Sequence, residues 1–175
     1  LNNVHAAGPG ICWTLKPNLV DYPVKGRCWG RDVSFSVSTN AEGLRGPALA
    51  PAGEKTRLLA LGDSTTYGLG VNNDETWPAQ MEAALNSRGG GAAFEALNAG
   101  VSGASTFQAL VYLDKRGLSF EPAAVLVCCG HNDFDSWNNM TDMEQAAAME
   151  SPAEPGAARS FSDLFALTRR AIGEA

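Results

Sequence analysis

Residues 58–70 read Leu-Leu-Ala-Leu-Gly-Asp-Ser-Thr-Thr-Tyr-Gly-Leu-Gly. The apolar run predicts a buried parallel strand, because strands covered on both faces are uninterrupted apolar segments. The run stops at Gly62 and leads into acidic and hydroxyl side chains. In open α/β sheets the reactive groups lie just beyond the carboxyl ends of the strands. Ser64 is therefore a candidate nucleophile, although a serine in such a loop also suits a turn or a helix cap.

From residue 56 to residue 175, predicted strands alternate with predicted helices, which indicates a parallel sheet with crossover helices. The third strand is wholly apolar, and this predicts a central position in the sheet. The predicted strands are residues 57–61, 93–97 and 123–128; the predicted helices run from the N-cap Thr76 to the glycines at 89–91, from about Ser105 to Gly117, over residues 143–150 and over residues 160–172.

Residues 1–55 differ from the rest of the chain in composition, because glycine and proline are too frequent there for long helices. The clearest strand is residues 32–38, in which Val33, Phe35 and Val37 alternate with serines. Residues 15–24 are its candidate partner, and a turn is expected at residues 40–43. We expect residues 1–55 to form a β-rich extension that covers part of the main domain, residues 56–175.

The overall charge is modest, with 13 basic against 19 acidic residues and no cluster of lysine and arginine. This balance argues against a nucleic-acid partner or an anionic membrane surface. No apolar run approaches the roughly 18 residues that a membrane span requires. Two of the four cysteines, Cys12 and Cys28, lie in a polar segment and would form a disulfide if the protein is exported, whereas Cys128 and Cys129 end an apolar run.

In a right-handed parallel sheet the loops after the three predicted strands emerge at one edge, so Ser64, Gly103 and Asn132 should converge. A serine that attacks an acyl carbon needs hydrogen-bond donors for the oxygen that becomes negative. Gly103 offers an unobstructed backbone N–H, and Asn132 offers its side-chain amide. The convergence predicts a nucleophile with an oxyanion-binding site, and no cofactor or metal is expected.

Other loop motifs fit less well. A Walker-type phosphate loop needs a lysine that is absent, a dinucleotide fingerprint needs glycines where Asp63 and Ser64 stand, and the α/β-hydrolase elbow needs a glycine where Thr66 stands. A loop that holds a flavin phosphate is the remaining alternative. It is disfavoured because Asp63 would place a negative charge beside the phosphate.

Three segments together resemble the GDSL or SGNH hydrolases, a family of serine esterases and lipases. The segments are Gly-Asp-Ser-Thr at residues 62–65, Asn98 to Gly103, and Gly-His-Asn-Asp at residues 130–133, in the family's order and spacing. Trp77-Pro78 and residues 40–47 are also similar to segments of family members, the latter to a lead-in of some bacterial ones.

The resemblance implies a flavodoxin-like, three-layer α/β/α fold with a parallel sheet. It also implies Ser64 as the nucleophile and an oxyanion hole built from the Ser64 N–H, the Gly103 N–H and the Asn132 side chain. The substrate would be a small-molecule ester or the ester of a carbohydrate or lipid. An O-acyltransferase with the same nucleophile, or a non-catalytic binding module of the same fold, are the rival functions.

The family's fourth segment, Asp-x-x-His, is absent. The two histidines are His5 and His131, which follow Asn2 and Cys128 by three residues, so neither completes that motif. His131 is a weak candidate for the base, because its neighbour Asn132 must point inward; we expect Asp63 and Asp133 to accept backbone hydrogen bonds. The expected carboxyl-terminal strands are also missing. We therefore expect an amino-terminal part of a longer protein, weak activity by itself, and an apolar sheet edge available for pairing.

Overall fold

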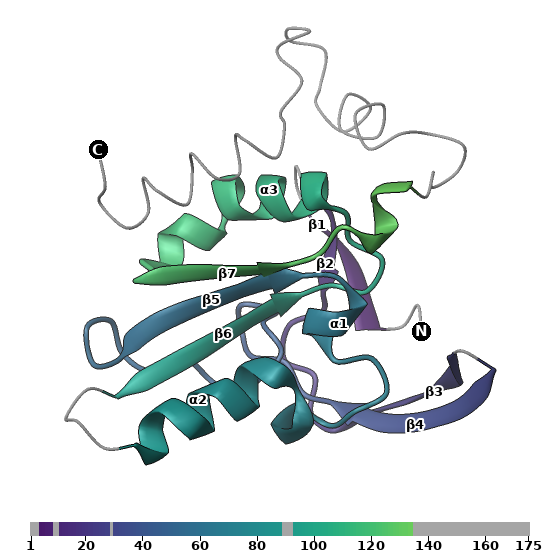
Figure 1. Ribbon diagram of the computed structural model, residues 1–175, viewed down its shortest axis with the longest axis horizontal. Coiled ribbons are helices and arrows are strands. Elements are labelled where there is room, and N and C mark those ends of the chain that lie inside the picture. The colour runs from purple at the N-terminus through teal and green to yellow at the C-terminus, as the bar shows by residue number, and fades with distance from the viewer. Residues whose placement is uncertain (1–3, 9–10, 29, 89–92, 135–175) are drawn as a thin grey trace, which may run out of the picture.

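The computed structural model describes residues 4–8, 11–28, 30–88 and 93–134. Its centre is a parallel sheet of three strands in the order β6-β5-β7, with α2 against one face and α3 against the other (Figure 1). The predicted three-layer α/β/α arrangement is confirmed. In this sheet β5 is Thr56–Gly62, β6 is Phe94–Gly100 and β7 is Ala124–Cys128; the helices and helical turns are α1 Ser64–Tyr67, η2 Asn73–Glu75, α2 Trp77–Ser87, α3 Thr106–Lys115, η3 Gly117–Phe120 and η4 His131–Phe134.

The apolar pattern of β7 predicts a central strand, and this prediction is wrong for the described sheet, in which β7 lies at the edge. The position of β7 agrees instead with the expectation of an apolar sheet edge. Val127 is 38% exposed, whereas Leu59, Ala60 and Leu61 of β5 are at most 1% exposed. An apolar run reports that both faces of a strand are covered, but it does not report how many strands pair with it. Within the described residues β7 pairs with β5 alone, which leaves its outer edge open.

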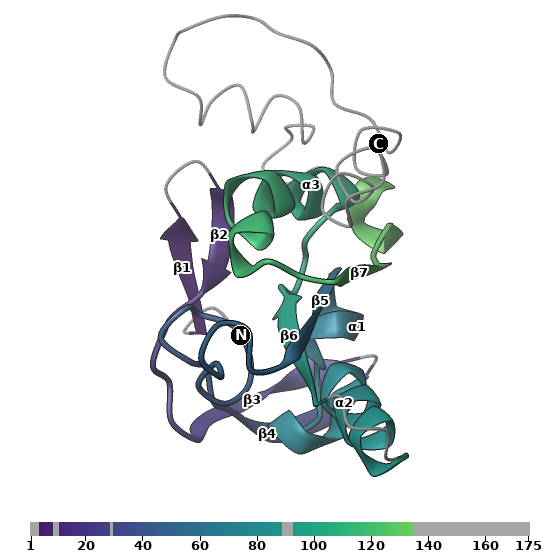
Figure 2. The same ribbon diagram turned by 90° about the vertical axis from the view of Figure 1, so that its left-hand side faces the viewer.

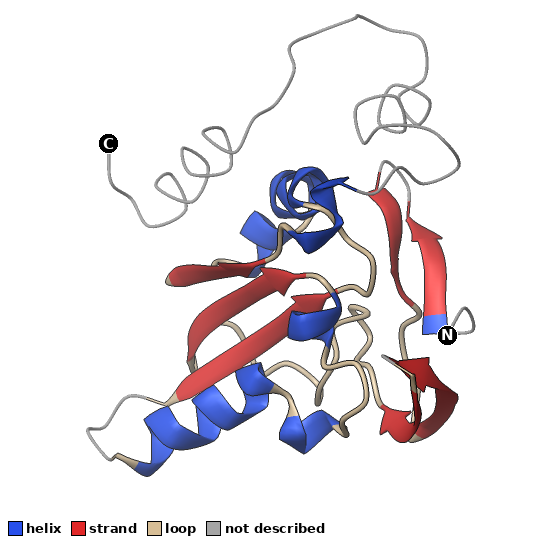
Figure 3. Ribbon diagram, turned by 45° about the vertical axis from the view of Figure 1, so that its right-hand side comes forward, coloured by secondary structure: helices blue, strands red, loops and turns tan. Residues whose placement is uncertain are grey.

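The chain before β5 forms two antiparallel hairpins on one side of the molecule, β1 His5–Gly8 with β2 Ile11–Leu15 and β3 Tyr22–Cys28 with β4 Arg31–Val37 (Figures 1 and 3). The strand predicted at residues 32–38 is confirmed, whereas the partner predicted at residues 15–24 is confirmed only for residues 22–24, because β3 pairs with β4 from Tyr22 to Cys28. Pro17 and two left-handed residues, Asn18 and Asp21, interrupt that stretch. A strand cannot continue through such backbone conformations, so the pairing begins at Tyr22.

The two hairpins share a hydrophobic core with α1. Tyr67 at the end of α1 is fully buried, and its ring packs at 72° to that of Phe35 with the centroids 6.4 Å apart. The other buried members of this cluster come from the hairpins: Val4, Leu15, Val24, Phe35 and Val37. A second cluster fills the space between the sheet and α3, with Leu59, Leu97, Leu110 and Leu113 among its members. The extension therefore packs directly on the helix that carries Ser64.

Arg45 ties this extension to the rest of the fold. Its side chain is buried and donates five hydrogen bonds to neutral oxygens, at 2.6 to 3.0 Å. The acceptors are the carbonyls of Tyr67, Gly68, Val71 and Ser36 and the side chain of Asn73. The guanidinium also lies 4.9 Å from the centroid of the Tyr67 ring, within cation–π range. Burial lowers the pKa of Arg45, and the charges of Tyr67 and Glu75 oppose this shift.

Several predictions fall on residues without a described placement. The helices predicted at residues 143–150 and 160–172 and the glycines at 89–91 lie outside the described residues, as do the side chains of Cys12 and Cys28. The predicted disulfide and the exported location that depends on it stay predictions. No helix among the described segments combines the length and hydropathy needed to cross a bilayer.

Replacing Arg45 should destabilise the protein far more than replacing an exposed arginine. Arg45→Met removes five hydrogen bonds from a buried site, although the Gly68 carbonyl and the Asn73 side-chain oxygen keep the N–H groups of Val71 and Ser38 as donors. We expect a loss of about 3 kcal/mol in the free energy of unfolding. Arg116→Met is the matched control, because its 3.3 Å ion pair with Glu42 is half-exposed and should be worth less than about 1 kcal/mol. Urea denaturation measures both, and equal losses would contradict the role assigned to Arg45.

Candidate active site

Ser64 occupies the first position of α1, immediately after β5. Asp63 is the N-cap of this helix, and its Oδ1 accepts the N–H of Thr65 at 2.9 Å. The N–H groups of the first helical turn have no partner within the helix, so the Ser64 N–H is one of the unpaired donors at this end. Ser64 itself is half-buried. The cap fixes where the helix begins and therefore which residue stands at its start.

Two glycines allow α1 to lie directly on the ends of the strands. A Cβ on Gly62 would overlap Thr66 Oγ1 and the Cys128 carbonyl, and a Cβ on Gly100 would overlap the backbone nitrogen of Tyr67. At this short distance the buried Thr66 donates its hydroxyl to the Cys128 carbonyl at 3.2 Å. This hydrogen bond links the helix that carries Ser64 to the end of β7, past the carboxyl end of β5.

Gly103 lies in a tight turn after β6. The Ala104 N–H donates to the Val101 carbonyl at 3.0 Å, and Gly103 has a φ of 84°, whereas Ser102 is not among the residues with positive φ. This combination defines a type II turn, which requires glycine or asparagine at its third position. Among the described residues, no acceptor bonds the Gly103 N–H. The turn therefore presents an unused backbone donor.

Asn132 lies in η4, the turn of helix that follows β7. Its Nδ2 donates to the Ala104 carbonyl at 2.9 Å, which leaves the second N–H of the amide available. The neighbouring Asp133 accepts the backbone N–H of Thr106 at 2.8 Å and its hydroxyl at 2.7 Å. These bonds attach the loop after β7 to the loop after β6 and to the start of α3.

The three strands end at the same level. Gly62 of β5 is paired with Gly100 of β6 and with Cys128 of β7, so the three loops leave the sheet at one edge, as predicted. Bonds between the loops continue past the strands: Val101 N donates to the Gly62 carbonyl at 3.0 Å, and Asp63 N to the Cys128 carbonyl at 3.3 Å. The arrangement gathers a hydroxyl and three N–H donors on neighbouring loops, a combination suited to acyl transfer.

The aspartates of these loops act as expected. Asp63 caps α1, and Asp133 accepts the N–H of Thr106 at the start of α3, which confirms that both accept backbone hydrogen bonds. His131 is exposed at the first position of η4. His5 lies in β1, with its ring centroid 6.4 Å from that of Tyr67, in the core of the extension.

Two further residues at this edge were not predicted from the sequence. The sequence marks Thr66 only as a departure from the elbow motif, and no sequence pattern marks Trp13 of β2. The Trp13 Nε1 donates to the Ser102 carbonyl at 3.3 Å, between residues 89 positions apart in the sequence. Nothing in the local pattern of residues 11–15 indicates this contact, since it depends on how the hairpin is placed.

The family is settled by comparison with known proteins. The model of the GDSL-like lipase/acylhydrolase family matches residues 60–173. The chain belongs to this family. The described architecture agrees with the flavodoxin-like α/β fold expected for the SGNH hydrolases. None of the curated proteins compared with the chain matches it.

Solved structures of SGNH-type enzymes are similar to the chain over part of their length. AlinE4, an SGNH-hydrolase family esterase, is 33% identical over 55% of this chain and 50% of its own, with a TM-score of 0.42. TesA is 22% identical over 66% and 56%, with a TM-score of 0.48. The psychrotrophic esterase EstA from Pseudoalteromonas sp. is 20% identical over 67% and 56%, with a TM-score of 0.47. The chain thus spans about half the length of the structures it matches.

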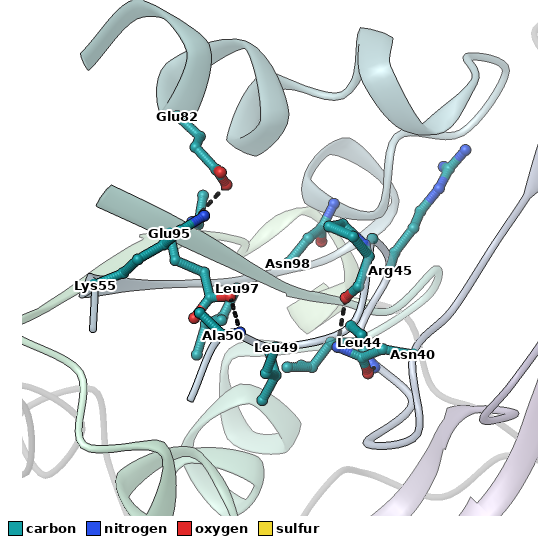
Figure 4. A pocket seen from close by; sticks show the side chains of 14 residues that line it. Asn40, Leu44, Arg45, Leu49, Ala50, Lys55, Glu82, Glu95, Leu97 and Asn98 are labelled. Atoms are coloured by element: carbon teal, nitrogen blue, oxygen red, sulfur yellow. Dashed lines mark hydrogen bonds between the residues drawn. The ribbon is translucent and has the colours of Figure 1, made fainter. Parts of the chain in front are cut away.

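A pocket of about 270 Å³ lies along the outer edge of β6, apart from the three loops (Figure 4). Residues 44–50 form one wall, and none of Ser64, Gly103 and Asn132 lines it. The Glu82 carboxylate accepts the Ala96 N–H at 2.8 Å, and buried Glu95 accepts the Ala50 N–H at 2.7 Å and pairs with Arg57 at 3.2 Å. These side chains cover the edge of β6.

The described part of the chain holds no cluster of three or more His, Cys, Asp or Glu suited to a metal ion.

Adjacent cysteines at the end of β7 should differ sharply in reactivity. Burial and the charges of Asp133 and Asp63 raise the pKa of Cys129 to about 12, whereas Cys128 is exposed. The thiolate is the nucleophile, so a raised pKa slows alkylation at pH 8. We expect iodoacetamide to modify Cys128 at least about tenfold faster than Cys129. Mass spectrometry of the peptide that contains both residues provides an internal control, and equal labelling would contradict this electrostatic environment.

Proposed function

We propose that this chain supplies the nucleophile and the oxyanion-binding groups of an ester hydrolase. The observation that carries the proposal is the level ending of β5, β6 and β7, which brings Ser64, the Gly103 turn and Asn132 to one edge of the sheet. Membership of the GDSL-like lipase/acylhydrolase family supports the same chemistry. The esterases among the similar structures are consistent with it but cover only part of the chain.

In the proposed reaction Ser64 Oγ attacks the acyl carbon of the ester and loses its proton to a general base. The carbonyl oxygen becomes negative and accepts hydrogen bonds from the Ser64 N–H, the Gly103 N–H and the free N–H of Asn132. Collapse of the tetrahedral intermediate breaks the bond to the alcohol oxygen, which leaves with a proton. Water then hydrolyses the acyl-serine ester and regenerates Ser64.

No residue of these 175 is assigned as the general base. Neither histidine stands three positions after an aspartate, and His131 is exposed at the start of η4. We propose that the base belongs to sequence outside these 175 residues. The reaction of the chain by itself should then be slow and should depend on a base from solution.

A fluorophosphonate probe tests the nucleophile. We expect slow covalent labelling of the 175-residue chain at Ser64, no labelling of Ser64→Ala, and faster labelling when imidazole is added as a replacement base. Ser119→Ala, which removes a hydroxyl from η3, should label like the wild type. Equal labelling of the wild type and Ser64→Ala would exclude Ser64, and rapid labelling without imidazole would show that the chain contains its own base.

Loss of the Asn132 amide should slow the same reaction. Asn132→Ala removes a donor to the developing oxyanion, which typically costs about 100-fold in rate. Asn86→Ala is the control, because this amide pairs with the backbone of Phe94 at the far end of β6. The measurement is the rate of labelling at Ser64, and an unchanged rate in Asn132→Ala would remove this residue from the site.

One rival function has an observation in its favour. A non-catalytic module of the same fold would account for the absence of Asp-x-x-His. Under that alternative Ser64 is inert both in this chain and in any longer chain that contains it. Labelling of a longer form at Ser64, together with cleavage of short p-nitrophenyl esters, would separate the two functions; transfer of the acyl group to an added alcohol in preference to water would identify an acyltransferase.

A further inference from the structure

The amino-terminal extension contacts the Gly103 turn directly. Trp13, in β2, donates its indole N–H to the Ser102 carbonyl at 3.3 Å. Strand β2 lies beside α3, which begins immediately after this turn (Figure 2). Two carbonyls of this turn therefore accept hydrogen bonds from different elements. The Ser102 carbonyl accepts one from Trp13 of β2, and the Ala104 carbonyl accepts one from Asn132 of η4.

The bonded carbonyl belongs to the peptide unit that carries the Gly103 N–H. A trans peptide is planar, and its C=O and N–H point in opposite directions. A donor that holds the Ser102 carbonyl on one side of the turn therefore also sets the direction of the Gly103 N–H on the other side. A hydrogen bond to the carbonyl further polarises the peptide and strengthens its N–H as a donor.

The four residues of the turn, 101–104, have a competing conformation in which the Gly103 N–H points in the opposite direction. Type I and type II turns share the bond between their first and fourth residues and differ by a rotation of the central peptide of about half a turn. The bond from Ala104 to Val101 therefore does not by itself fix the Gly103 N–H. The Trp13 indole adds the missing constraint, because it bonds the carbonyl only in the orientation that the structure shows.

We propose that Trp13 is a positioning residue for the oxyanion hole: the extension holds the Ser102–Gly103 peptide so that the Gly103 N–H serves the reaction at Ser64. This inference rests on the proposed function. Trp13 is assigned no contact with substrate or nucleophile, and its proposed effect on the reaction passes through the Ser102 carbonyl. The extension is thereby a component of the catalytic apparatus as well as a cover for α1.

The first experiment compares Trp13→Phe with Trp77→Phe in the full 175-residue chain. Both changes remove an indole N–H, but the buried Nε1 of Trp77 has no hydrogen-bond partner in the described structure. With a fluorophosphonate probe, Trp13→Phe should lower the maximal labelling rate at Ser64 about five- to tenfold and leave the half-saturating probe concentration unchanged. Trp77→Phe should leave both unchanged. A maximal rate in Trp13→Phe equal to that of the wild type overturns the proposal.

A second measurement separates this proposal from the proposed function. Benzothienylalanine at position 13 keeps the size of the ring and replaces the N–H by sulfur, so packing is preserved even where phenylalanine disturbs the hairpin. NMR should show a shift of the Ser102 carbonyl carbon and of the Gly103 amide in this variant. Shifts without any labelling of the wild type would refute the serine mechanism but retain the constraint on the peptide. Unchanged resonances would show that the bond from Trp13 does not hold this turn.

Discussion

The buried guanidinium of Arg45 is the contact on which the arrangement of the fold depends. It bonds carbonyls from β4, from the end of α1 and from the segment that follows α1, so one side chain joins the extension to the edge of the sheet that carries Ser64. A lysine could not replace it, because only the planar fork of arginine directs several donors to separate acceptors at once. The backbone N–H of Arg45 also bonds the Asn98 carbonyl on the outer edge of β6. The residue therefore connects the sheet, α1 and the extension.

The geometry of the candidate site follows from close approach of backbone to backbone. Gly62 and Gly100 lack the Cβ atoms that would hold α1 away from the sheet, and Thr66 uses the space to bond β7. Asn132 and Asp133 form hydrogen bonds that join the loop after β7 to the loop after β6. Each of these bonds has a structural role before any substrate is present. A preorganised set of donors is what stabilisation of a developing oxyanion requires, since donors already in place need no reorganisation during the reaction.

The extension contacts both the helix that carries Ser64 and the turn that carries Gly103. Tyr67, at the end of the helix that begins with Ser64, is buried among hairpin side chains, and burial raises the pKa of its hydroxyl while the charge of Arg45 opposes that shift. Trp13 reaches the turn after β6. The hairpins therefore contact the loops after two of the three strands. This explains why residues far from Ser64 in the sequence bear on its surroundings.

Local residue chemistry was sufficient to predict the strand that leads to Ser64, the helices that begin after Thr76 and Ser105, and the three loops at one edge. Each prediction depends on apolar periodicity, on caps, or on the fixed direction of parallel strands, all of which neighbouring residues specify. The apolar pattern predicted a central β7, and the predicted partner of β4 began at residue 15 instead of residue 22, because strand neighbours are chosen by packing between distant segments. Only the tertiary structure decided that Trp13 bonds Ser102 and that Arg45 joins three parts of the chain, since such contacts form between residues whose separation along the sequence carries no periodic signal.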